Sequence, residues 1–160
     1  MHERRYAGVI AVDQDRIVLV RERFEHWGGD FWIIPSGMVE WHERPDVGAA
    51  RELTEETGLI ALASDLELVS TSATGCGDHR SLAWNFKTTV RNSDFAVDDP
   101  DDSVLEARWF DLDESLTLLR RFPYPPLAEP IIGYLDGSAE VGSHWVYPSA
   151  DLEPTVTATR

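Results

Sequence analysis

Two short runs of β-branched residues near the start of the chain constrain its fold more than any other local pattern. They cover residues 5–12 (RYAGVIAV) and 16–21 (RIVLVR), and only Asp13, Gln14 and Asp15 separate them. β-Branched side chains favour extended strands, and a short polar break between two such runs favours a turn. The pattern predicts a β-hairpin, and with it a sheet.

The next strong pattern is a helix at residues 44–57. Pro45 suits its first turn, where the missing N–H is not needed, and Gly58 suits the position just past its end. Further strands are expected at residues 65–72, 82–91 and 107–110, and further helices at 116–121 and 126–135. A helix between strands, followed by more helices, predicts an α/β (α+β) fold in which helices cover a sheet.

Length and charge limit the class of protein. A chain of 160 residues with 42% hydrophobic residues is large enough for one domain with its own core. The net charge of −15 argues against a nucleic-acid polymer as partner, since binding to a phosphate backbone needs clustered Lys and Arg. Beyond Gly137 the patterns fade. The expected domain therefore covers residues 1–137, and the expected tail, partly disordered, covers residues 138–160.

No segment predicts export or membrane insertion. The N-terminal stretch is interrupted by charged residues such as Asp13 and Arg16, and no run reaches the roughly 20 apolar residues of a membrane helix. Cys76 is the only cysteine, which excludes an intrachain disulfide. We expect a cytoplasmic protein that does not bind a membrane.

Three glutamates share one face of the helix expected at 44–57. At 100° per residue, Glu52, Glu55 and Glu56 fall within an arc of about 100°. The opposite side carries the predicted core face, formed by Val47, Ala50, Leu53 and Thr57. The carboxylates have two interpretations: a solvated helix face, or a site for Mg²⁺ or Mn²⁺, which prefer oxygen ligands.

The residues around these glutamates favour the second interpretation. The segment fits the pattern G-x5-E-x7-R-E-U-x-E-E-x-G-U, where U is a bulky aliphatic residue. The specified positions are Gly37, Glu43, Arg51, Glu52, Leu53, Glu55, Glu56, Gly58 and Leu59. This box, residues 37–59, resembles the signature of the Nudix hydrolases, and with its flanking patterns the resemblance covers roughly residues 5–135.

The resemblance implies a fold and a reaction. Nudix proteins share a mixed β-sheet sandwiched between helices. Their common reaction is the Mg²⁺-assisted hydrolysis of a nucleoside diphosphate linked to another moiety. A small nucleotide-type substrate is therefore expected, such as a nucleoside triphosphate, ADP-ribose or a nucleotide-sugar. Dimers are common in the family, so a homodimer is one expected state.

The resemblance also implies roles for the residues of the box. Gly37 would contribute its backbone carbonyl to the metal shell, and Glu55 and Glu56 would be the principal metal ligands. Glu52 would either ligate metal or act as the base on the attacking water. Arg51 belongs to the same catalytic set, and Glu43 would bridge back to it and hold the loop against the helix.

Residues outside the box are weaker candidates. Arg21, Arg23 and Arg80 could contact substrate phosphates. Many Nudix proteins carry a late metal-binding Glu, and Ser103 occupies the aligned place here, which leaves Asp102 or Glu106 as substitutes. The acidic run at residues 98–102 (DDPDD) is most simply a solvated loop.

The substrate and the exact activity stay open. Residues 122–132 (FPYPPLAEPII) are similar to a stretch in MutT-type enzymes, with Ala128 where those can carry a base-reading Asn. Two alternatives compete with the nucleotide hydrolase: an enzyme acting on a non-nucleoside diphosphate, and a non-catalytic nucleotide-binding module. The intact glutamates argue against the second alternative.

Overall fold

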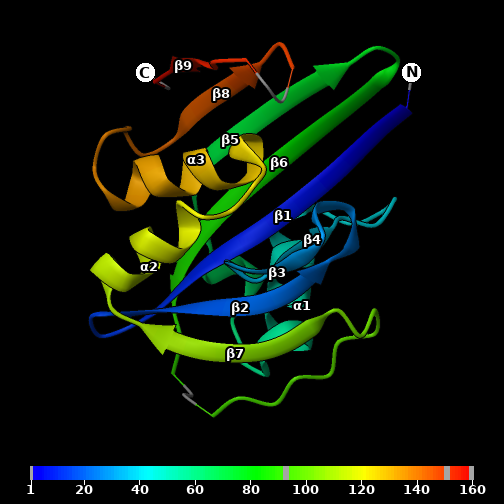
Figure 1. Ribbon diagram of the computed structural model, residues 1–160. Coiled ribbons are helices and arrows are strands. Elements are labelled where there is room, and N and C mark those ends of the chain that lie inside the picture. Colours follow the sequence, from blue (N-terminus) through cyan, green and yellow to red (C-terminus); the bar gives the residue numbers. More distant parts are fainter. Residues whose placement is uncertain (1, 92–93, 150–151, 159–160) are drawn as a thin grey trace.

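The computed structural model describes residues 2–91, 94–149 and 152–158 (Figure 1). The strands are β1 (His2–Asp13), β2 (Arg16–Phe24), β3 (Gly29–Ile33), β4 (Ser36–Met38), β5 (Glu67–Cys76), β6 (His79–Thr89), β7 (Val104–Phe110), β8 (Ser143–Tyr147) and β9 (Thr155–Thr157). The helices are α1 (Pro45–Thr57), α2 (Leu112–Leu119) and α3 (Pro125–Leu135), with short 3₁₀ turns at Glu25–Trp27 and Ala63–Asp65. The predicted hairpin is confirmed, with Val12 opposite Ile17.

The described strands form one mixed sheet. Its order is β3-β2-β1-β6-β5-β8-β9, with β4 added beside β1 and β7 beside β2. β1 pairs in parallel with β6, and β5 in parallel with β8, whereas the other pairs are antiparallel. Because β4 lies against residues 6–8 of β1, the start of the box is fixed at the middle of the sheet.

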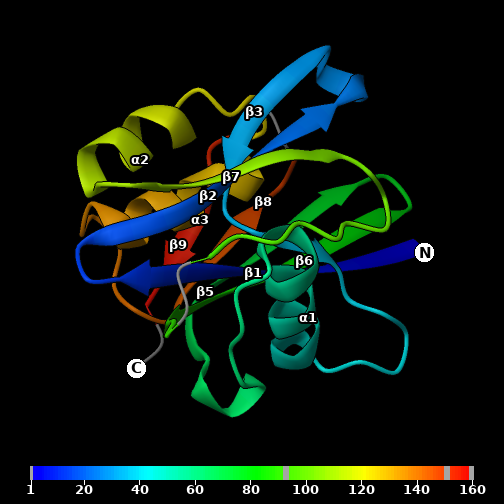
Figure 2. The same ribbon diagram turned by 90° about the horizontal axis from the view of Figure 1, so that it is seen from below.

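Helices cover both faces of this sheet. α1 lies on one face against β1 and β4, and α2 and α3 lie on the other, as the view from below shows (Figure 2). The predicted fold, a mixed sheet between helices, is confirmed. None of the helices in the described part of the chain is long and apolar enough to cross a membrane.

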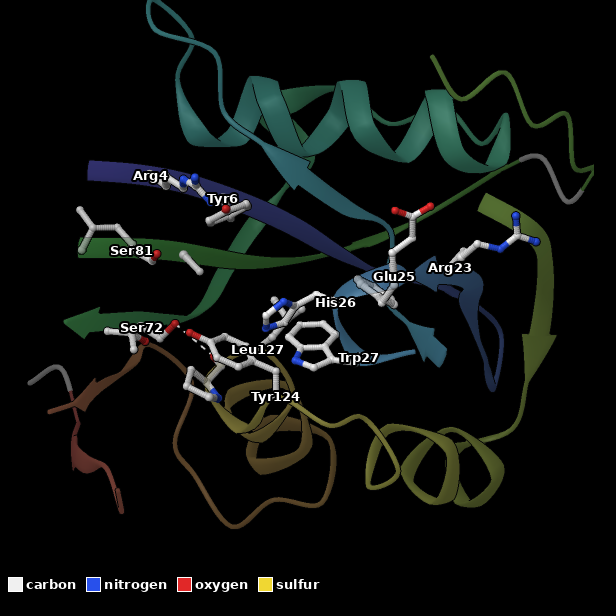
Figure 3. Close-up of a pocket in the computed structure, with 15 residues that line it drawn as sticks. Arg4, Tyr6, Arg23, Glu25, His26, Trp27, Ser72, Ser81, Tyr124 and Leu127 are labelled. Atoms are coloured by element: carbon white, nitrogen blue, oxygen red, sulfur yellow. Dashed lines mark hydrogen bonds between the residues drawn. The ribbon is translucent and has the colours of Figure 1, made fainter. Parts of the chain in front are cut away.

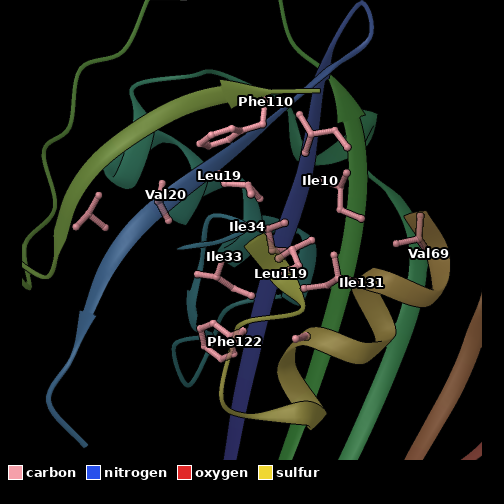
Figure 4. Packing of buried hydrophobic residues seen from close by; sticks show 13 residues of the cluster. Ile10, Leu19, Val20, Ile33, Ile34, Val69, Phe110, Leu119, Phe122 and Ile131 are labelled. Atoms are coloured by element: carbon pink, nitrogen blue, oxygen red, sulfur yellow. The ribbon is translucent and has the colours of Figure 1, made fainter. Parts of the chain in front are cut away.

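The two faces of the sheet bury separate cores, as the period-2 alternation of a strand requires. Ile10 of β1 joins the core under α2 and α3, together with Leu19, Phe122 and Ile131 (Figure 4). Its neighbour Val9 points to the opposite side. The core under α1 includes Val9, Ala49, Leu53, Leu59 and Phe86.

The buried face of α1 differs from the predicted one. Val47 is 42% exposed, whereas Ala49, Leu53 and Thr57 are fully buried. Glu56, predicted to lie on the outward face, is only 4% exposed. A helical wheel places side chains around one axis but does not show which strands enclose the helix. Here the sheet covers the sector that contains Glu56.

The segment expected as a tail contributes two strands. β8 pairs with β5, and β9 pairs with β8. Trp145 and Tyr147 of β8 are buried, and the Tyr147 hydroxyl donates a hydrogen bond of 2.8 Å to Glu129 of α3. The sequence SHWVY is short, and its strand pairs with β5, far away in the chain, as well as with the nearby β9. Residues 150–151 and 159–160 of the expected tail lie outside the described residues.

Because α3 and β8 are in close contact, we expect a side chain added at Gly133 to destabilise the fold. A Cβ there would lie 2.9 Å from the Trp145 ring. We expect Gly133→Val to lower the free energy of unfolding by about 1–3 kcal/mol through overpacking. The control is Gly75→Val in β5, where a Cβ meets nothing within 4 Å. Urea denaturation followed by circular dichroism measures both, and equal stability of the two variants would contradict the contact.

Candidate functional site

Arg51 joins the loop before α1 to the helix itself. Its Nε and Nη2 donate to the two carboxylate oxygens of Glu43, at 2.9 and 3.0 Å. Nη2 also donates to the backbone oxygen of Met38, at 2.9 Å. Glu43 accepts a further bond from the Glu40 N–H, so both ends of the loop are tied to one guanidinium. The planar fork of Arg suits such a two-oxygen contact.

The same guanidinium orients two glutamates of the box. Arg51 Nη1 donates to Glu52 Oε1 at 2.8 Å and to Glu55 Oε2 at 3.1 Å. The hydrogen bonds from Arg51 hold the pKa of Glu43 below its usual value, and the Glu43 contact in turn raises the pKa of Arg51. Arg51 is therefore the charge that keeps three carboxylates close together.

Two backbone positions in β4 fit closely around the carboxylates. A Cβ on Gly37 would collide with the Glu52 carboxylate, so only glycine allows this approach. The Ser36 N–H donates to Glu56 Oε2 at 3.0 Å. Burial, and next the charge of Glu22, raise the pKa of Glu56 well above its usual value. Burial likewise raises the pKa of Glu52.

Glu22 of β2 is a member of this cluster that the sequence analysis missed. Its Oε1 accepts a hydrogen bond of 3.1 Å from Ser103 Oγ. Burial raises the pKa of Glu22 to about 7, and the charges of Asp99 and Glu52 act in the same direction. The sequence held one indication of this residue: Glu22 is a single acid between Arg21 and Arg23, just after the apolar run of β2. Only the fold shows that this acid faces α1.

The acidic run at residues 98–102 is a loop with Asp98, Asp101 and Asp102 exposed, as expected, and it also makes ordered contacts. The Asp98 N–H donates to the backbone oxygen of Glu55 at 2.8 Å, which attaches the loop to α1. The Asp99 carboxylate accepts from the backbone N–H groups of Asp101, Ser103 and Val104. Burial acts to raise the pKa of the Asp99 carboxyl. These hydrogen bonds outweigh burial, so the pKa of Asp99 lies below its usual value. Asp99 thus organises the loop beside Glu22.

The chemistry of this cluster fits a hard divalent cation. Its donors are carboxylate oxygens and the backbone at Gly37, which Mg²⁺ and Mn²⁺ prefer. Within residues 2–91, 94–149 and 152–158, no three acidic, histidine or cysteine side chains are spaced to hold one ion. Glu52 and Glu55 instead each give one oxygen to Arg51, and Glu56 gives one to Ser36. Each carboxylate keeps a second oxygen outside these bonds.

Glu106, the expected late ligand, is engaged by two arginines. It stands beside Arg21 in the β2–β7 pairing and accepts a hydrogen bond of 3.2 Å from it. It also pairs with Arg108. Although burial acts the other way, contacts with Arg108 and then Arg21 lower the pKa of Glu106. Besides burial, the charges of neighbouring acids such as Asp99 and Asp101 raise the pKa values of Glu22, Glu52 or Glu56.

Two of the three expected phosphate-binding arginines, Arg21 and Arg23, share the carboxylate of Asp30. Arg21 is engaged by Asp30 as well as by Glu106, both at 3.2 Å. Arg23 lies 3.7 Å from Asp30 and lines a cavity of about 580 Å³. Arg80 lies at a smaller, separate cleft of about 240 Å³. The structure therefore does not bring the three arginines together.

The larger cavity is lined by residues of β1 and β2, the strands that also adjoin the carboxylate cluster. Tyr6, on its wall, pairs in register with Met38, the residue after Gly37, and Arg23 follows Glu22. Trp27 and Tyr124 stack on the opposite wall with ring centroids 5.5 Å apart (Figure 3). The remaining lining residues are Arg4, Phe24, Glu25, His26, Ser72, Thr74, Ser81, Leu82, Ala83, Pro126 and Leu127.

Comparison with known proteins agrees with this arrangement. A family model described as "NUDIX domain" matches residues 2–129. An octanoyltransferase of Myxococcus xanthus is 34% identical over 123 residues, covering 72% of this chain and 31% of that protein. A MutT-like protein of Streptomyces ambofaciens is 34% identical over 59 residues, covering 37% of this chain and 36% of that protein. The chain thus spans about a third of the length of these relatives.

Solved structures show the same fold. A NUDIX hydrolase from Nitrosomonas europaea aligns with a TM-score of 0.67 at 22% identity, covering 87% of this chain and 93% of that one. At this identity the likeness concerns the arrangement of helices and strands alone.

Removal of the Arg51 guanidinium should destabilise the fold. In Arg51→Met, the carboxylates of Glu43, Glu52 and Glu55 stay close together without their common partner. We expect the free energy of unfolding to fall by about 2–3 kcal/mol at pH 7, slightly less than for a fully buried pair. Arg44→Met is the matched control, since Arg44 is exposed and pairs with the neighbouring Asp46. A loss no larger than that of the control, measured by urea denaturation, would refute this role.

Glu22 should make stability depend on pH. Its pKa is about 7 in the folded state and about 4.5 in the unfolded state, so the folded protein binds the proton more tightly. The stability that Glu22 contributes is complete below about pH 4.5 and is lost as the pH rises through about 7. Without divalent cations, Glu22→Gln should therefore be more stable than the parent protein at pH 8, by about 2–3 kcal/mol, with no such gain at pH 4.5.

Glu114→Gln, at an exposed position of α2, is the control for this titration. Its stability should follow the parent protein from pH 4.5 to 8. A difference between Glu22→Gln and the parent that stays constant over this range would show that Glu22 does not titrate as described.

Proposed function

The chain belongs to the NUDIX family, and from this premise we propose that it is a divalent-metal-dependent hydrolase of a pyrophosphate bond. The bond would lie in a nucleoside diphosphate linked to another moiety. A nucleoside triphosphate, ADP-ribose and a nucleotide-sugar are the candidate substrates. The cation would be Mg²⁺ or Mn²⁺.

One observation carries the proposal: a buried glutamate in a cluster of acids. Glu56 is 4% exposed, and its neighbours include Glu22 and Glu52, whose charges disfavour its ionised form. Burying a carboxylate among others costs stability unless a cation compensates it. A structural role alone would be served by an uncharged side chain at lower cost.

We assign each residue of the box a separate role in the reaction. Glu55, Glu56 and the Gly37 carbonyl would hold the cation, which would offset the charge of the pyrophosphate and make water a better nucleophile. Glu52 either adds an oxygen ligand or accepts the proton of the attacking water. Arg51 fixes the rotamers of Glu52 and Glu55 through its hydrogen bonds and acts on the reaction through them.

The cavity of about 580 Å³ would receive the nucleoside. Its aromatic wall, Trp27 and Tyr124, suits a planar base, and the hydroxyls of Ser72, Thr74 and Ser81 offer hydrogen bonds. Arg23 lines this cavity and is our candidate for a phosphate contact. Arg21 and Glu106 form an ion pair with each other, and we propose that this pair has a structural role. The cytoplasmic location and the homodimer stay predictions from the sequence.

A phosphate-release screen tests the proposal. The full chain is incubated with Mg²⁺ and nucleoside triphosphates, ADP-ribose, nucleotide-sugars or dinucleoside polyphosphates, with a phosphatase added where the product needs one. We expect turnover of at least one substrate, reduced by about 100-fold or more in Glu56→Gln and unchanged in Glu114→Gln. Turnover that persists in Glu56→Gln, or that survives a chelator, would refute the mechanism. Ligand-induced thermal stabilisation without turnover would favour the binding-module alternative.

A further inference from the structure

A second cleft lies at the free ends of β1 and β6. It has a volume of about 240 Å³ and is lined by His2, Arg4, His79, Arg80 and Ser81. The His2 and His79 rings stack with centroids 5.6 Å apart, because the two residues face each other in the parallel pairing. Two arginines, two imidazoles and a hydroxyl thus line a cleft that contains no carboxylate among its lining residues.

These arginines differ from most others in this acidic chain. Arg21, Arg51 and Arg108 each pair with at least one carboxylate. Among the residues that the structure describes, neither Arg4 nor Arg80 has a carboxylate within 4.0 Å, although Glu3 and Asp78 are close in sequence. With a net charge of −15, the chain has many acids available, so an acid-free cleft with two arginines is a local charge reversal.

The cleft lies next to the larger cavity. Arg4 and Ser81 line both spaces. Along β1, Ala7 pairs with Gly37 of the box, Tyr6 and Arg4 line the cavity, and His2 lines the cleft. At about 3.3 Å per residue, His2 lies about 16 Å along the strand from Ala7. The order is therefore carboxylate cluster, nucleoside cavity, basic cleft.

We propose that this basic cleft binds a second phosphate group of the substrate, carried on the sugar of the nucleoside. The inference rests on the proposed function, which supplies the rest of the substrate: the nucleoside and its pyrophosphate. Phosphate offers several acceptor oxygens, and the cleft offers only groups that can donate to them: guanidinium, imidazole and hydroxyl. A substrate of this class is a nucleoside diphosphate derivative with an additional phosphate monoester on its sugar.

Binding of inorganic phosphate tests the cleft without any reaction. The probe is titrated into the ¹⁵N-labelled full chain in the presence of a chelator, and amide shifts are followed by NMR. We expect saturable shifts at His79 and Ser81, which are lost in Arg4→Gln. Arg5→Gln is the matched control, since the neighbouring Arg5 stacks over Trp84, with its Cζ 5.5 Å from the ring centroid. Absent shifts, or shifts that persist equally in both variants, would overturn the proposal.

Hydrolysis then separates this inference from the proposed function. For a substrate found in the screen, the form with an added 2′- or 3′-phosphate should show about tenfold higher kcat/KM, and Arg4→Gln should remove that preference. No preference for either form would overturn the cleft as a substrate subsite, even with activity intact. Phosphate binding that depends on Arg4, in a chain without hydrolytic activity, would support the phosphate site and refute the proposed function.

Discussion

The Arg51 guanidinium is the interaction on which the arrangement of the site depends. It contacts the backbone of Met38, both oxygens of Glu43, and one oxygen each of Glu52 and Glu55. One side chain thus fixes the loop that leaves β4 and the rotamers on the helix that follows. Without this charge, the carboxylates would repel each other and the loop would lose its connection to α1.

A second constraint is electrostatic and concerns the enclosed acids. Glu22 and Glu56 come from strand and helix, and their mutual repulsion is not relieved by Arg51. The Ser36 N–H and the Ser103 hydroxyl compensate one oxygen of each. The folded chain therefore keeps excess negative potential in one small region, which is the condition under which a cation or a proton is bound tightly.

The sequence alone predicted the parts of this protein that depend on local patterns. The β1–β2 hairpin follows from β-branched runs around a polar turn, and α1 lies between Pro45 and Gly58 as expected. The box residues were named from a pattern that resembles a known signature, and the structure joins Glu43, Glu52 and Glu55 through Arg51. Glu22 and β8 were missed because both depend on contacts across the fold: one on which side of β2 faces α1, the other on pairing with β5. The exposure of Val47 was missed for the same reason, since a helical wheel does not show which strands pack against the helix.

The docking of β8 has a consequence for how the cavity is assembled. Tyr124, Pro126 and Leu127 form the wall contributed by the start of α3, and α3 is held by Glu129 and Gly133 against Tyr147 and Trp145. During synthesis the chain emerges from its N-terminus, so the carboxylate box is complete long before β8 appears. The acids of the box are thus assembled first, and the wall that would select a substrate is secured only after residue 147 has been added.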